Sequence, residues 1–122
     1  MKMKKILIVE DETLIALDLK NRLERHGYQV MPVAGSAAEA VESAIKNRPD
    51  IILMNVVLKG EKTGIEAACV INESYTVPIL FITGNAHCFN DERLKKIPVY
   101  RILGKPPYES VLLVSIGELI KK

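Results

Sequence analysis

The sequence predicts an α/β fold in which a doubly wound, five-stranded parallel sheet of order 2-1-3-4-5 carries five helices on its two faces. Two observations predict this fold. Short apolar runs alternate with amphipathic stretches along all 122 residues, and the first run, Ile6–Val9, is apolar without interruption. An unbroken apolar run suits a parallel strand buried on both faces, and strict alternation of strand and helix favours a single sheet covered on both sides.

The predicted strands are the apolar runs at residues 6–9, 30–34, 51–54, 78–82 and 99–103. The predicted helices cover residues 13–26, 36–47, 64–72, 91–96 and 108–121, with a loop at 60–63, and the segment 91–96 is the shortest and weakest helix. Ser36 and Glu39 have the spacing of a capping box, and Gly27 supplies a helix stop. The first helix is predicted by leucines at helical spacings, namely Leu14, Leu17, Leu19 and Leu23.

Length and composition predict one domain over residues 1–122, long enough to bury a core without disulfides or a metal. A net charge of +2 is too small to predict nucleic-acid or membrane binding. Cys69 and Cys88 lack CxxC spacing and are interpreted as reduced thiols of a cytoplasmic protein. The apolar runs are shorter than the roughly 18 residues of a membrane span, and the apolar start is too short for a signal peptide.

Polar side chains follow four of the predicted strands at their carboxyl ends. Glu10 and Asp11 follow the first strand, Asn55 ends the third, Thr83 follows the fourth and Lys105 follows the fifth. In doubly wound sheets of this order, ligands bind beyond the carboxyl ends of the strands, at the switch between strands one and three. We therefore expect these side chains to form one pocket.

The residue types predict a pocket that handles a phosphoryl group with a hard cation. The Glu10–Asp11 pair offers the oxygen ligands that Mg²⁺ takes, while the Thr83 hydroxyl and the Lys105 ammonium suit phosphoryl oxygens. A cis peptide bond between Lys105 and Pro106 would aim that ammonium into the pocket. Each residue alone has a plainer explanation: a carboxylate at a helix dipole, a helix cap, or a solvated lysine. Their convergence at one edge favours the site.

These residues and their spacing resemble the receiver domain of response regulators in two-component signalling, over essentially the whole chain. The resemblance rests on residues 6–12, 49–55, 58–60 with 64–66, 81–83 and 105–106. In that family, the acidic pair and an aspartate on the third strand hold Mg²⁺, and the aspartate accepts phosphate from a kinase histidine. The resemblance implies metal positions at Glu10, Asp11, Asn55 and the backbone carbonyl of Val57. It also implies that Thr83 and Lys105 contact the phosphoryl group and shift the helix 4–strand 5–helix 5 face.

Three departures from the family pattern stand out. Asn55 occupies the phosphoacceptor position, and an amide is not a nucleophile, so the resemblance implies that phosphorylation is lost. Ile102 occupies the switch position where the family usually has an aromatic residue, with Tyr100 two residues earlier as a candidate substitute. Gly84 follows Thr83 where alanine is common. Two explanations of Asn55 are open: a natural degenerate receiver, or an introduced block in an intact one.

The favoured function is a non-enzymatic receiver module of a phosphorelay that acts through regulated protein–protein contact. The expected partner is a sensor histidine kinase or another signalling protein, with weak Mg²⁺ binding and an optional homodimer through the helix 4–strand 5–helix 5 face. The alternative is a flavodoxin-like domain that binds a small molecule or nucleotide. Against it, residues 10–12 are all acidic where a nucleotide site would need a glycine-rich phosphate loop. A phosphohydrolase is disfavoured because the first strand lacks an Asp-x-Asp ending.

Overall fold

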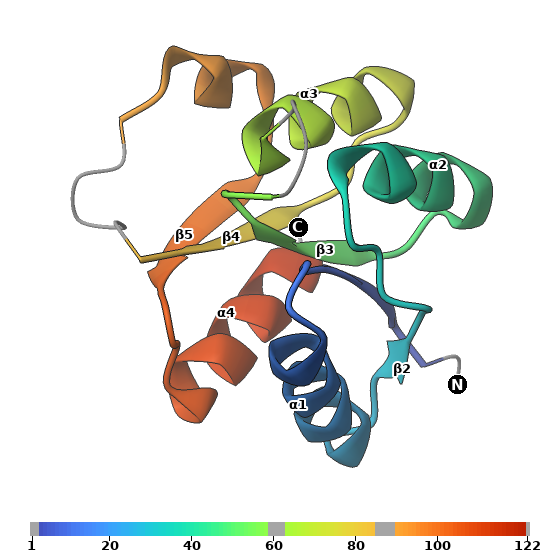
Figure 1. Cartoon of the computed structure of the whole chain (residues 1–122), viewed down its shortest axis with the longest axis vertical. Helices are drawn as coiled ribbons and strands as arrows, with labels where there is room; N and C mark the ends of the chain where they lie inside the picture. The colour runs from blue at the N-terminus through green and yellow to red at the C-terminus, as the bar shows by residue number, and fades with distance from the viewer. Residues whose placement is uncertain (1–2, 59–62, 85–89, 122) are drawn as a thin grey trace.

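A computed structural model describes residues 3–58, 63–84 and 90–121 of the chain. Its centre is a five-stranded sheet of order β2-β1-β3-β4-β5 (Figure 1), in which every pair of neighbouring strands is parallel. The strands are β1 Lys5–Val9, β2 Gln29–Val30, β3 Ile51–Asn55, β4 Ile79–Thr83 and β5 Tyr100–Gly104. The predicted strand order is confirmed.

Four α-helices cover the sheet within the described residues: α1 Thr13–Arg25, α2 Ala37–Asn47, α3 Gly64–Ser74 and α4 Glu109–Ile120. Helices α2 and α3 lie on one face and α1 and α4 on the other (Figure 1). In the part of the chain that the structure describes, no helix is long and apolar enough to cross a membrane.

Strands β1, β3 and β4 are buried on both faces, which explains their unbroken apolar sequences. Successive side chains point to opposite faces, so each strand contributes to two separate clusters. Leu7 and Ile52 pack with α2 and α3, whereas Ile8 and Leu53 pack with α1 and α4. The sheet therefore separates two hydrophobic cores, and the polar residues at the carboxyl ends of β1, β3, β4 and β5 lie at its edge.

Local signals fix the helix ends. Ser36 accepts a hydrogen bond from the Glu39 amide at 3.2 Å, as its predicted capping role requires, but the Glu39 carboxylate accepts from Gly35 instead of closing the capping box. Gly27, with φ of +88°, follows the end of α1 in the conformation that glycine favours. A complete capping box that the sequence reading missed joins Thr63 to Glu66 at the start of α3.

The second predicted strand, residues 30–34, is wrong in extent. Strand β2 is only Gln29–Val30, and Ala34 pairs with Val9 through an isolated bridge. Pro32 explains the break, because proline has no backbone N–H to donate to a ladder. The amides of Met31 and Ala34 still bond to the carbonyls of β1, so the chain stays beside the sheet without forming a regular strand.

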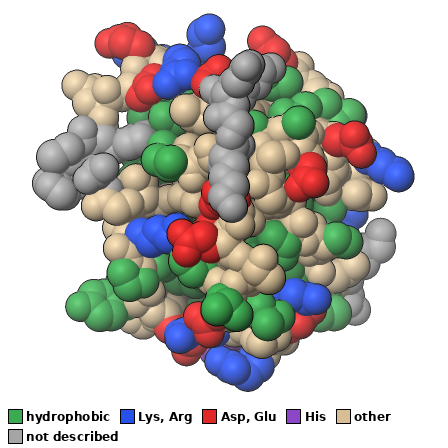
Figure 2. Space-filling view, in the orientation of Figure 1, with side chains coloured by type: hydrophobic (Ala, Val, Ile, Leu, Met, Phe, Trp, Pro, Cys, Tyr) green, Lys and Arg blue, Asp and Glu red, His purple; other side chains and the backbone are tan. Residues whose placement is uncertain are grey.

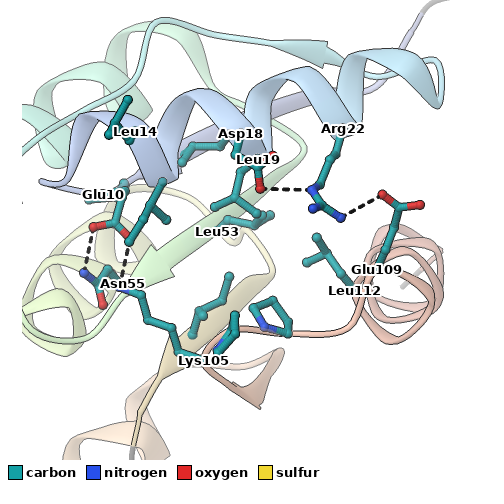
Figure 3. Close-up of a pocket in the computed structure, with 16 residues that line it drawn as sticks. Glu10, Leu14, Asp18, Leu19, Arg22, Leu53, Asn55, Lys105, Glu109 and Leu112 are labelled. Atoms are coloured by element: carbon teal, nitrogen blue, oxygen red, sulfur yellow. Dashed lines mark hydrogen bonds and ion pairs between the residues drawn. The ribbon is translucent and has the colours of Figure 1, made fainter.

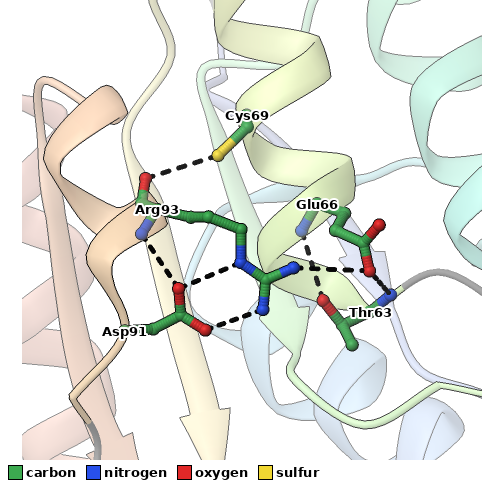
Figure 4. Close-up of polar contacts among 5 residues, drawn as sticks. All are labelled: Thr63, Glu66, Cys69, Asp91 and Arg93. Atoms are coloured by element: carbon green, nitrogen blue, oxygen red, sulfur yellow. Dashed lines mark hydrogen bonds and ion pairs between the residues drawn. The ribbon is translucent and has the colours of Figure 1, made fainter.

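The predicted helix at 91–96 is also wrong in type, because the chain forms a short 3-10 helix at Glu92–Lys96. Side-chain contacts hold this turn. Asp91 accepts hydrogen bonds from the backbone amide and the guanidinium of Arg93, and the guanidinium also lies 3.5 Å from the Glu66 carboxylate on α3 (Figure 4). Leu94 is buried beneath the turn. We call the contacts among Asp91, Arg93 and Glu66 the Arg93 brace. They stabilise the five-residue turn without the i to i−4 hydrogen bonds of an α-helix.

The Cys69 thiol on α3 belongs to the same brace. It donates to the Arg93 carbonyl at 3.5 Å (Figure 4). Burial raises the pKa of the Cys69 thiol, so it stays protonated and able to donate. This contact supports a structural role for Cys69. Cys88 and most of the predicted loop at 60–63 lie outside the described residues.

Replacing Gly64 should disrupt the junction between β3 and α3. A Cβ atom at Gly64 would lie 2.1 Å from the Asn55 carbonyl oxygen and 2.8 Å from the Met54 side chain. We expect Gly64→Ala to lower the free energy of unfolding by about 1–3 kcal/mol, the usual cost of overpacking, as measured by urea melts. In α4, Gly117 has open space around it, so Gly117→Ala should be neutral or stabilising. Equal destabilisation by both variants would contradict the close approach.

The brace should respond to acid. Arg93 lowers the pKa of Asp91 to about 2, so the ionised carboxylate stabilises the fold above about pH 4 and loses that effect as the pH falls toward 2. NMR shifts of the Leu94 and Ile97 amides should therefore move in this pH window in the unsubstituted chain. In Asp91→Asn the same movement should be absent. Glu92→Gln is the matched control, because the Glu92–Lys95 pair is exposed; the movement should persist there.

Candidate functional site

The carboxyl ends of four strands bring the predicted polar residues to one edge. Glu10 follows β1, Asn55 ends β3, Thr83 ends β4, and Lys105 follows β5. Glu10, Asn55 and Thr83 are exposed by only 5%, 9% and 5%, and the only other buried polar residue in the described part of the chain is Ser115. Burying polar groups costs free energy unless they are bonded, so the contacts among these residues decide what the site can do.

Glu10 is the centre of the site (Figure 3). Its Oε1 accepts a hydrogen bond from Lys105 Nζ at 3.1 Å, and its Oε2 accepts from Asn55 Nδ2 at 3.2 Å and from the Glu12 amide at 3.1 Å. The side chains of Glu10 and Lys105 are 4% and 24% exposed, so the ion pair is largely shielded from water. The carboxylate is compensated in full by groups of the chain itself.

Asn55 fits this arrangement because it donates. Its amide nitrogen faces the Glu10 carboxylate, which accepts hydrogen bonds and has none to give. A carboxylate at the same place would set two like charges beside each other. Among the described residues, none donates a hydrogen bond to the Asn55 side-chain oxygen.

The other predicted site residues are placed differently. Asp11 is half-buried beside Glu10, and Val57 follows β3 with 73% of its surface exposed. Ile102 on β5 packs against the core beneath α2 and α3, whereas the pocket that contains Lys105 opens between α1 and α4. Tyr100 is 40% exposed and meets Phe81 edge-on, with ring centroids 6.2 Å apart. The structure thus does not bring Ile102 to the Glu10–Lys105 contact. The Lys105–Pro106 peptide bond is cis.

The donor types suit a hard cation, but the bonds on Glu10 oppose one. Glu10 and Asp11 supply carboxylates, and Asn55 and Val57 supply an amide and a carbonyl oxygen of the kind that Mg²⁺ accepts. Both Glu10 oxygens already accept hydrogen bonds, so a cation there would compete with Lys105 and Asn55 for the carboxylate. Within residues 3–58, 63–84 and 90–121, no three His, Cys, Asp or Glu side chains are grouped to hold a metal.

A groove beside this edge was not predicted from the sequence. It has a volume of about 480 Å³, lies between α1 and α4, and reaches Glu10, Asn55 and Lys105 at one end. The signal that could have indicated it is the amino-terminal half of α1. Leu14 belongs to the predicted leucine pattern of this helix, yet it is 81% exposed and lines the groove.

The fold and the edge residues together define a doubly wound α/β domain with a charged pocket at the switch between β1 and β3. The chain belongs to the response regulator receiver domain family, whose family model matches residues 6–116. The resemblance given by the sequence motifs is confirmed at this level.

Relatives and solved structures agree with this assignment. The chain is 34% identical over 113 residues to the transcriptional regulatory protein PdtaR of Mycobacterium tuberculosis, covering 93% of this chain and 55% of that protein. It is 40% identical over 79 residues to the phyllosphere-induced regulator PhyR of Methylorubrum extorquens, covering 64% of this chain and 30% of that protein. The chain thus spans about half the length, or less, of these curated relatives.

Two solved structures are similar over nearly the whole chain. One is the N-terminal domain of a response regulator/sensory box/GGDEF protein from Carboxydothermus hydrogenoformans. Its TM-score is 0.88 and its identity 30%, and the match covers 97% of this chain and 94% of that one. The other is the receiver domain of a sensor histidine kinase from Pseudomonas aeruginosa. Its TM-score is 0.85 and its identity 28%, and the match covers 99% of this chain and 100% of that one. That structure has a magnesium ion coordinated in its active-site cleft.

Removing the ammonium at position 105 should expose the cost of burying Glu10. In Lys105→Met, the Glu10 carboxylate keeps its bonds from Asn55 and Glu12 but loses its counterion. We expect the free energy of unfolding in chelator to fall by about 1–3 kcal/mol in urea melts. Lys95→Met is the control, because the Lys95–Glu92 side chains are 79% and 85% exposed and such pairs contribute little. A similar loss in both variants would count against the pairing.

Proposed function

We propose that this chain is a receiver module of a two-component phosphorelay in which phosphotransfer is lost at position 55 and signalling proceeds through protein–protein contact. One observation carries the proposal. Asn55 occupies the end of β3 inside the pocket, and its amide donates to Glu10. An acyl phosphate forms by attack of a carboxylate oxygen, and a neutral amide lacks that nucleophile. The site keeps the shape of a receiver pocket without its reacting atom.

The proposal includes weak Mg²⁺ binding. Glu10, Asp11, Asn55 and the Val57 carbonyl would hold the ion, which when bound neutralises negative charge at the strand ends. Two carboxylates are available, and one of them, Glu10, is already paired with Lys105 at 3.1 Å. A cation therefore competes with a covalently attached ammonium for the same carboxylate, and this competition supports low affinity.

The proposed output is contact with another protein, either a sensor histidine kinase or a further signalling protein. Apolar side chains on α4 and β5 support this. Tyr108, Val111 and Val114 are 81%, 44% and 60% exposed at helical spacing, with Tyr100 on the adjacent strand. Figure 2 shows apolar side chains gathered over the start of α4, at the lower left of the view. Large exposed apolar groups clustered on one face mark contact surfaces.

The same face is the proposed surface for a homodimer. It contains β5 and α4, which are strand 5 and helix 5 of the sequence prediction. Sedimentation velocity of the unsubstituted chain and of Val114→Glu tests this: a dimer that the substitution dissociates supports it, and a monomer in both cases contradicts it. We further propose that the module itself is cytoplasmic, is not an enzyme and does not contact nucleic acid or membranes, in keeping with its modest net charge of +2.

The central test is phosphate uptake. The chain should not be labelled by radioactive acetyl phosphate or by a phosphorylated histidine kinase, since the Asn55 amide is not a nucleophile. Asn55→Asp should gain labelling that is acid-stable and base-labile. Robust Mg²⁺-dependent labelling of the chain with Asn55 would sink the proposal. Asp11→Asn is the control for a weak signal from the neighbouring carboxylate, because it should remove that signal alone.

Restoring the carboxylate should also change metal affinity and stability. Asn55→Asp should bind Mg²⁺ about tenfold more tightly in calorimetric titration, because a third carboxylate joins the pocket. In chelator it should lower the free energy of unfolding by about 1–3 kcal/mol through repulsion from Glu10, and added Mg²⁺ should recover much of that loss. Equal Mg²⁺ affinity in both forms would contradict the weakened site. Greater stability of Asn55→Asp in chelator would show that Lys105 dominates the pocket.

A further inference from the structure

The groove between α1 and α4 has the dimensions and the lining of a small-molecule site. Its volume of about 480 Å³ falls in the range of roughly 300–1,000 Å³ that such sites occupy. Helices α1 and α4 and strands β3 and β4 all contribute apolar walls, so the groove is set by the rigid core of the domain (Figure 3). The apolar residues that matter below are Leu14, Ile15, Leu19, Leu53, Ile82 and Leu112.

Charged groups stand at the two ends of this α1–α4 groove (Figure 3). At the strand-end side, Lys105 pairs with Glu10, and the two charges cancel. At the other end, the Arg22 guanidinium lies 3.0 Å from the Asp18 carboxylate and 3.1 Å from the Glu109 carboxylate. One cation shared by two carboxylates leaves an excess of one negative charge at the Arg22 end.

This distribution determines which ligand charge the groove accepts. Both lining cations, Lys105 and Arg22, are already paired, so an anionic ligand would have to break an existing ion pair. A cationic ligand instead meets two carboxylates, Asp18 and Glu109, that share the single guanidinium of Arg22 and leave one negative charge in excess. The strand-end side adds a hydrogen-bond acceptor, the side-chain amide oxygen of Asn55, which lines this end of the groove.

We propose that the α1–α4 groove binds a small molecule with an apolar body and one cationic group, such as a primary ammonium. The ammonium lies against Asp18 and Glu109, and the apolar body packs between Leu19 and Leu112. A donor group at the far end of the ligand would reach the Asn55 oxygen. This binding needs no reaction at position 55, so it succeeds or fails independently of the proposed loss of phosphotransfer.

The two carboxylates set selectivity more than affinity. The side chains of Asp18 and Glu109 are 61% and 40% exposed, and water weakens charge interactions at such sites. We expect a cationic ligand to bind about fivefold more tightly than a neutral ligand of the same shape. Burial of the apolar body between the two helices provides the remainder of the affinity.

Three matched probes test the proposal on the full chain at pH 8. The probes are 2-phenylethylamine, 2-phenylethanol and phenylacetate, which share one ring and differ in charge. Backbone amide NMR titrations should give saturable shifts in α1 and α4, with affinity falling from the ammonium to the alcohol to the carboxylate. No saturable shift up to about 10 mM of any probe would overturn the proposal.

Charge reversal provides the decisive variant. In Asp18→Asn/Glu109→Gln, the Arg22 end changes from an excess negative to an excess positive charge, so phenylacetate should now bind more tightly than the amine. Both positions are partly exposed, and folding is checked by the amide spectrum. Glu118→Gln is the matched control, because Glu118 lies elsewhere on α4 and pairs with Arg101 of β5. This variant should keep the original order of probe affinities.

A further variant tests the groove itself. Ile15→Trp fills it and should weaken all three probes about tenfold or more, whereas Leu17→Trp, at a 50% exposed position of α1 that does not line the groove, should not. An unchanged probe order after charge reversal would overturn the proposal. Saturation by a leucine-rich amphipathic peptide, with no binding of the three probes, would likewise overturn it and assign the groove to a protein.

Discussion

A buried carboxylate must be matched by donors, and at Glu10 this constraint ties three parts of the sheet edge together. The carboxylate receives an ammonium from the segment after β5, an amide from the end of β3 and a backbone N–H from its own turn. Each donor comes from a different place in the sequence, so the arrangement exists only when the strands are in register. The residue at position 55 is part of this match, because a donor there stabilises the same charge that a second carboxylate would repel.

The fold and the location of the site could be predicted because both depend on local patterns. Unbroken apolar runs gave the buried strands, and parallel strands place their carboxyl ends at one edge, so polar residues after each run converge. Two elements were predicted wrongly, for different reasons. The 3-10 turn at Glu92–Lys96 depends on tertiary contacts, because Arg93 reaches two carboxylates, whereas the early end of β2 follows from a local signal that was overlooked, the missing amide of Pro32. The switch role of Ile102 stays a prediction; its side chain packs against the core.

The family assignment and the site describe a receiver whose pocket supplies its own cation. In the similar Pseudomonas aeruginosa receiver domain a magnesium ion occupies the active-site cleft. Here the Lys105 ammonium already lies against Glu10. A magnesium ion at this edge would therefore have to compete with a covalently tethered ammonium for the Glu10 carboxylate.

The close contact at Gly64 has a mechanical consequence. The Gly64 amide bonds to the Val56 carbonyl at 2.8 Å, so the first turn of α3 rests directly on the chain that follows Asn55. Eleven residues of helix form a stiff rod about 16 Å long. Two residues after its first, the rod carries Glu66, which is coupled to Arg93. A displacement of the β3 terminus would therefore be transmitted as a rigid-body tilt of α3. The segment Glu92–Lys96 would move with the helix, because Arg93 is coupled to Glu66.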